Sequence, residues 1–150
     1  MLPKLRGIAH FTGQTHRQGI VAHDRQLKNF AQVPPNKFVL FDLERAEFFE
    51  PGSDAPEFHG GCVADLNDLV GSLVAHGYLS TSTDKMFKDE LAANVLTSYL
   101  EVNLSEHVLD AWDKIVDDAM LERSRNGFEV VGGALGHVAV AGIGSQPIGA

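Results

Sequence analysis

The amino-acid sequence predicts an α+β fold, specifically a ferredoxin-like βαββαβ sandwich in which two helices cover one antiparallel or mixed sheet. Three observations predict it. Two segments, 65–76 and 105–125, carry apolar residues three or four positions apart, as one-sided helices do. Segments with alternating or β-branched residues lie before, between and after them. At 150 residues, the chain has the length of one ordinary domain.

The first half of this domain is expected to hold one strand and one helix. The strand covers 37–49, with Val39 among its apolar residues, and a loop with two prolines follows at 50–56. Asp65 is expected to cap the helix over 65–76, and Gly77 to end it in the left-handed conformation. The inner face of this helix comprises Leu66, Leu69, Val70, Leu73 and Val74.

The second half is expected to supply the rest of the sheet. A short strand is predicted over 78–83, a helix over 84–94 and a strand over 96–104, although 84–100 fits either helix or strand. The helix over 105–125 has the longest apolar stripe, which includes Trp112, and Asn126-Gly127 is expected to stop it. Strands over 128–131 and 134–143 follow, joined at Gly132-Gly133.

The two ends of the chain are expected to lie outside the domain at 37–143. Residues 1–36 have few large apolar side chains in a regular period, which predicts an extended N-terminal arm. Such an arm packs on its own domain or on a neighbouring subunit. Residues 144–150 are rich in glycine and alanine and predict a flexible tail.

The composition indicates the compartment of the protein and the classes of partner that are unlikely. The net charge of −8 repels phosphate backbones, so nucleic acid is an unlikely partner. The one cysteine, Cys62, excludes an internal disulfide and fits a reducing compartment. The sequence has neither eighteen consecutive apolar residues nor a signal peptide. We therefore expect a cytoplasmic protein, or a component of a virus particle, without a membrane span.

The residues that carry chemistry do not form a complete motif. His59 and Cys62 make a single HxxC pair, whereas a structural zinc site needs four ligands, so no metal is predicted. Cys62 follows Gly60-Gly61 before a predicted helix, a position in which a thiol can become reactive. The glycine-rich C-terminus lacks the lysine of a P-loop and the helix of a dinucleotide site. No cofactor is expected, and the catalytic residues stay unknown.

The segment Gly77-Tyr78-Leu79-Ser80-Thr81-Ser82 resembles the aromatic-x-Ser-Thr-Ser strand of arginine-serine-glutamate ADP-ribosyltransferases. In that family an upstream Arg-Gly step helps to hold NAD, and Leu5-Arg6-Gly7 is the matching place here. The family also uses a downstream Glu-x-Glu or Gln-x-Glu pair, and no such pair follows Ser82. The resemblance implies a NAD-using activity that lacks its catalytic acid.

Two functions are compatible with these features. The first is a non-catalytic structural subunit of a larger homo- or hetero-oligomeric assembly, with protein partners, which the arm and the tail favour. The alternative is a small oligomeric enzyme or ligand-binding protein whose site is shared between subunits, with ADP-ribosyltransferase-like activity as the named case. The candidate site residues for this alternative are Arg6, His10, Cys62, His76 and Ser80.

Overall fold

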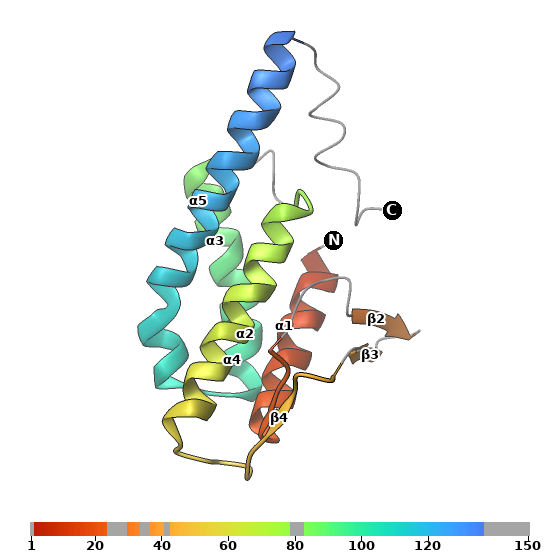
Figure 1. The fold of residues 1–150 in the computed structure, drawn as a ribbon, viewed down its shortest axis with the longest axis vertical. Coiled ribbons are helices and arrows are strands. Elements are labelled where there is room, and N and C mark those ends of the chain that lie inside the picture. The colour runs from red at the N-terminus through yellow and green to blue at the C-terminus, as the bar shows by residue number, and fades with distance from the viewer. Residues whose placement is uncertain (1, 24–29, 34–36, 41–42, 79–82, 137–150) are drawn as a thin grey trace.

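The computed structural model describes residues 2–23, 30–33, 37–40, 43–78 and 83–136, and it shows a bundle of helices with small strands at one side (Figure 1). The elements are α1 (Leu2–Arg17), β1 (Ile20–Val21), β2 (Phe30–Val33), β3 (Lys37–Leu40), β4 (Glu47–Phe48), α2 (Pro56–Ala75), α3 (Asp84–Leu91), the π-helical turn η2 (Ala92–Leu96), α4 (Thr97–Val102) and α5 (Glu106–Gly136). Within these residues the strands form two antiparallel pairs, β1–β4 and β2–β3. The predicted ferredoxin-like sandwich is therefore wrong, and the helices cover one another instead of a sheet.

The N-terminal segment is a core helix, so the predicted extended arm is also wrong. Buried residues recur every three or four positions along α1 and form its inner face: Leu5, Ile8, Ala9, Thr12 and His16. The polar residues Thr12 and His16 occupy positions where a typical amphipathic helix has apolar ones. The apolar period therefore ends after Ala9, and a search for large apolar residues misses this helix.

The helix predicted over 65–76 is present, but it begins nine residues earlier, at Pro56. Its predicted inner face is confirmed, because Leu66, Leu69, Val70, Leu73 and Val74 are all buried. Gly77 has a φ of 82°, which confirms the left-handed ending. Asp65 does not cap the helix; it lies within α2 and is buried. Burial also raises the pKa of the Tyr78 phenol above its ordinary value of 10.0.

Residues 84–102 form one helical run, so the strand predicted over 96–104 is wrong. The Thr83 side chain caps this run by accepting a hydrogen bond from Met86 N at 3.2 Å. Its buried positions are spaced by four: Phe87, Leu91, Val95 and Tyr99. At 3.6 residues per turn, side chains four positions apart point in directions that differ by about 40° around the helix axis. The wider turn η2 offsets this drift and keeps the four side chains on one face.

Helix α5 confirms the helix predicted over 105–125 and extends well past it. Its first amides are capped by Ser105, whose hydroxyl oxygen accepts a hydrogen bond from Val108 N at 3.2 Å. The buried stripe comprises Val108, Trp112, Ile115, Val116 and Ala119. The helix continues through Asn126-Gly127 to Gly136, beyond the ends of α2 and α3 (Figure 1). The strand over 128–131 is thus wrong, as is the start of the strand over 134–143; residues 137–150 lie outside the described residues.

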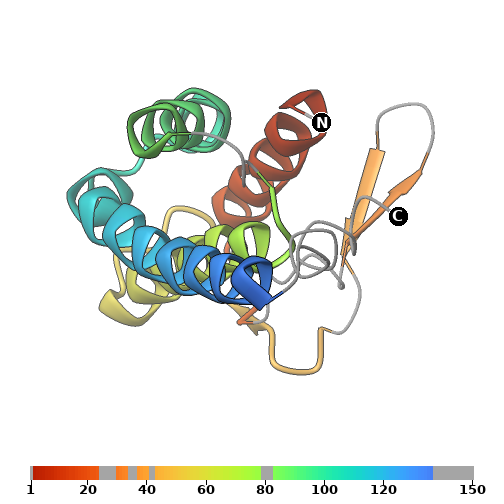
Figure 2. The same ribbon diagram turned by 90° about the horizontal axis from the view of Figure 1, so that it is seen from above.

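The strand predicted over 37–49 is reduced to two short strands, β3 and β4, which belong to different pairs. The β2–β3 hairpin stands on the outer side of α1, away from the other helices (Figure 2). Phe38 packs against this helix, whereas Val39 is 37% exposed. Of the strand predicted over 78–83, the described part is Tyr78, which lies in a turn, and Thr83, which caps α3.

The main core lies between α1, α2, the run α3–α4 and α5, and contains Leu69 and Trp112, which are 1% and 8% exposed. A smaller cluster joins Val21, Phe58 and Cys62 near β1. Within the described part of the chain, no helix is long and apolar enough to span a membrane.

Candidate functional site

A groove of about 870 Å³ runs between α1, α4 and the hairpin strand β3. Its size lies within the range of small-molecule sites. It brings together Arg6 and His10, two of the five residues that the sequence analysis selected, because they lie one turn apart on α1. The groove is lined by Arg6, Gly7, His10, Phe11, Gln14, Lys37, Phe38, Val39, Ser98 and Glu101.

The apolar wall of this groove depends on a glycine in α1. A Cβ atom at Gly7 would lie 2.5 Å from Cε2 of Phe38, so glycine lets this ring rest directly on the helix backbone, and a larger residue would displace it. The ring of Phe11 lies next to it, with centroids 6.4 Å apart, and Phe30 contacts Phe11 edge-on at 6.1 Å. These aromatic contacts hold the hairpin against α1 and form one side of the groove.

Polar groups line the opposite side. The Arg6 Nε donates a hydrogen bond to Oδ1 of Asn94 in η2, with the two atoms 2.9 Å apart. Ser98 follows on the next turn and is only 4% exposed, whereas Glu101 and Lys37 are exposed. The site therefore combines an aromatic wall with a small set of polar groups from three elements, as ligand sites commonly do.

A buried polar network joins α1 and α4, two of the elements that line the groove, to α2. Nε2 of His16 lies 2.8 Å from Oδ2 of Asp65, and Nδ1 of His16 lies 2.6 Å from the Tyr99 hydroxyl. All three side chains are 0% exposed. Asp65 also accepts hydrogen bonds from the backbone amides of Ala22 at 3.0 Å and His23 at 2.8 Å.

Asn103 extends this network at its outer end. Its Nδ2 donates to the Tyr99 hydroxyl oxygen at 2.9 Å, and that hydroxyl lies 2.6 Å from Nδ1 of His16. On the other side of the imidazole ring, Nε2 of His16 donates to Oδ2 of Asp65 at 2.8 Å. These contacts join three helices in a region that solvent does not reach, so we interpret the network as structural.

Sequence reasoning missed this network. Asp65 was interpreted as a helix cap, and His16 and Tyr99 were not selected. The available signal was weak: an acidic residue next to the apolar face of α2, and a histidine four residues after Thr12. The partners lie 49 and 83 residues apart in the sequence, so spacing alone does not pair them.

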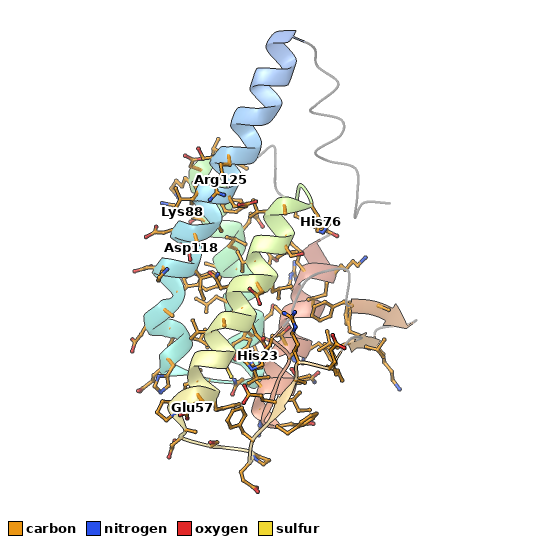
Figure 3. All side chains as sticks on the ribbon, in the orientation of Figure 1. His23, Glu57, His76, Lys88, Asp118 and Arg125 are labelled. Carbon is orange, nitrogen blue, oxygen red and sulfur yellow. The ribbon has the colours of Figure 1, made fainter. Side chains whose placement is uncertain are left out.

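A second cavity of about 500 Å³ lies between α2 and α5 and contains His76. Figure 3 shows His76 near the end of α2, and Asp118 and Arg125 along α5. The remaining side chains around it are mostly small or polar, and the one large apolar residue, Leu121, is 61% exposed. It lacks the aromatic wall of the first groove and is the weaker candidate.

The other selected residues lie elsewhere. Cys62 is 3% exposed and sits inside α2 beside Val21 and Phe58, not at a helix N-terminus. His59 stacks on His107 of α5, with ring centroids 3.9 Å apart. Ser80 lies outside the described residues, and Arg6-Gly7 lies within a helix. Among the described side chains, no group of three or more histidine, cysteine, aspartate or glutamate residues could hold a metal ion.

The groove is thus defined by its own geometry, without a known site to compare it with. Two observations make it the leading candidate: the convergence of Arg6 and His10, and the aromatic wall formed by Phe11 and Phe38. Comparison with known proteins gives no relative, because no family model, curated protein or solved structure matches this chain.

Proposed function

We propose that this chain is a ligand-binding protein whose site is the groove between α1, α4 and β3. One observation carries the proposal: cationic, hydroxyl and aromatic side chains from three elements converge on a groove of about 870 Å³. A ligand-binding protein belongs to the alternative function that the sequence analysis left open. The preferred hypothesis of an assembly subunit rested largely on an extended arm over 1–36, and residues 2–17 of that arm form the core helix α1.

Filling the groove from its hairpin wall is expected to abolish binding. Val39 lines the groove and is 37% exposed, so a Val39→Trp variant should fold and place an indole in the ligand space. A ligand at 100 times its Kd stabilises the folded protein by about 2.7 kcal/mol. For a chain of this size, that raises the Tm by about 5–10 °C. Thermal-shift screening against metabolites should find such a ligand for the wild type and no shift for Val39→Trp.

The matched control is Leu43→Trp. Leu43 is 43% exposed and lies outside the groove, so this variant should keep the ligand-induced shift of the wild type. No shift with any metabolite in the panel, or an equal shift in Val39→Trp, would contradict the proposal.

A second candidate function is a subunit of a larger assembly with protein partners, and a separate observation favours it. Phe48 in β4 is 71% exposed, and Leu104 between α4 and α5 is 81% exposed. Both segments lie at the end of the bundle where α4 ends and α5 begins (Figure 1). Large apolar side chains exposed at one end of a molecule are a common feature of association surfaces.

If this end of the bundle mediates self-association, replacing both residues with serine is expected to dissociate the assembly. The native chain should then show a multiple of its 16.2 kDa mass by light scattering, and Phe48→Ser/Leu104→Ser should show the monomer mass. Leu121→Ser is the control, because this exposed leucine lies far along α5. A monomeric wild type, at concentrations up to the millimolar range, would argue against self-association.

A further inference from the structure

The Arg6 side chain is held in a defined orientation by a chain of hydrogen bonds. Nδ2 of Asn94 donates to the backbone oxygen of Glu90 at 2.9 Å and to its Oε2 at 2.8 Å. With its amide group oriented in this way, Asn94 presents Oδ1 to Nε of Arg6 at 2.9 Å. The two terminal nitrogens of the guanidinium then remain as a fork, and this fork matches the two oxygens of a carboxylate.

The π-helical turn η2 places Asn94 where it can do this. Asn94 lies in the middle of the turn and is 4% exposed, while the adjacent Val95 is 1% exposed in the main core. Single π-helical turns within α-helices occur frequently at functional sites. Here the turn serves both the core face of the helix and the side that faces Arg6.

Ser98 supplies a second polar group on the same side of the helix. It lies four residues after Asn94, lines the groove and is only 4% exposed. A serine hydroxyl both donates and accepts hydrogen bonds, so it can bind a ligand oxygen in the groove.

The charge of the lining selects the ligand further. Arg6 and Lys37 are cationic and Glu101 is anionic, which leaves one positive charge when His10 is neutral. The chain as a whole carries −8, so this is a local cationic site on an acidic protein. One net positive charge suits a monoanion better than a doubly charged phosphate monoester.

We infer that the groove binds a monocarboxylate with an apolar body. The fork of Arg6 and the hydroxyl of Ser98 hold the carboxylate, and the rings of Phe11 and Phe38 contact the apolar body. This inference rests on the proposed ligand-binding function, and it adds the chemical class of the ligand. The body is an aryl group or an acyl chain, and the shared feature is a single carboxylate at one end.

Calorimetric titration with four probes tests the inference. 2-Naphthoate and decanoate carry the carboxylate on an aryl and an acyl body, 2-naphthamide is the neutral analogue, and 1-naphthyl phosphate carries a larger charge. The wild type is expected to bind at least one carboxylate about tenfold more tightly than the amide and the phosphate. Whichever carboxylate binds more tightly identifies the body.

Two variants localise the carboxylate. Arg6→Lys keeps the charge but loses the fork, and it should weaken carboxylate binding about tenfold while leaving 2-naphthamide binding unchanged. Ser98→Ala should weaken the carboxylate severalfold in the same selective way. Arg17→Lys is the control, because Arg17 is exposed on α1 outside the groove.

The outcomes separate this inference from the proposed function. If 2-naphthamide binds as tightly as 2-naphthoate and Val39→Trp blocks both, the groove binds ligands but the carboxylate assignment is overturned. Preference for the phosphate, or equal carboxylate affinity in Arg6→Lys, overturns it as well. If no probe binds the wild type, the carboxylate inference is overturned, and the metabolite screen then decides whether the groove binds other ligands.

Discussion

Replacing Asp65 with alanine is expected to lower the free energy of unfolding by about 3–5 kcal/mol. The Asp65 carboxylate is fully buried and accepts hydrogen bonds from Nε2 of His16 and from the backbone amides of Ala22 and His23. Alanine leaves these three donors buried without an acceptor, and each unmet donor costs about 1–3 kcal/mol. Urea denaturation monitored by Trp112 fluorescence measures the change.

A second substitution cannot easily restore the lost stability, because two of the unmet donors are the backbone amides of Ala22 and His23. His23 has a φ of 63°, a left-handed conformation that is uncommon for residues other than glycine. The carboxylate of Asp65 stabilises this turn through its hydrogen bond with His23 N. Replacing His16 and Asp65 together with leucine should therefore recover only part of the loss, because the backbone donors stay unmet. Asp65→Asn should be intermediate, since the amide keeps one acceptor oxygen.

The matched control is Asp113→Ala on α5. Asp113 is exposed, and substitutions of this kind usually change stability by less than about 0.5 kcal/mol. If Asp65→Ala stays within about 1 kcal/mol of the wild type, the network does not hold α1, α2 and α4 together.

The sequence predicted the parts of the fold in which large apolar residues face the core. The inner faces of α2 and α5 were identified because leucine, valine and tryptophan recur there at helical spacing. Helix α1 was not identified, because Thr12, Gly13 and His16 occupy much of its inner side. These residues are accommodated by partners on α2 and α4, which are distant in sequence. Two one-sided helices alone need a sheet to cover their apolar faces, but α1 and the α3–α4 run provide that cover instead.

The error at residues 96–104 has a different physical cause. Leu100, Val102 and Leu104 alternate as in a strand, whereas Val95 and Tyr99 continue a spacing of four. Burial shows which period matters: Tyr99 is 0% exposed and Leu104 is 81% exposed. Tyr99 belongs to the main core, and its hydroxyl also has hydrogen-bond partners in His16 and Asn103.

The candidate site was predictable only as separate residues. Arg6 and His10 were selected as chemically capable side chains, but nothing in their spacing links them to Lys37 or Ser98. Their convergence follows from the parallel packing of α1 and the α3–α4 run, in which Arg6 contacts a residue 88 positions away. Such a site depends on the fold, so an incorrect fold prediction hides it.

Gly13→Ala is expected to destabilise the protein by about 1–3 kcal/mol, although the same change usually stabilises a helix. A Cβ atom at Gly13 would lie 2.8 Å from the backbone oxygen of Tyr99 and 2.7 Å from Cγ2 of Val102. The Val102 methyl can shift, but the Tyr99 carbonyl moves only with α4. Overpacking at this contact therefore outweighs the gain in helix propensity.

Gly71→Ala provides the matched control with the opposite sign. Gly71 lies inside α2, and a Cβ atom there would have no neighbour within 4 Å, so alanine should raise stability by about 0.5–1 kcal/mol. Urea denaturation of the two variants compares one chemical change in two helices. Stabilisation in both would mean that α1 and α4 are not in close contact at Gly13. Because the same two helices form opposite sides of the groove, that result would also remove the structural basis of the proposed site.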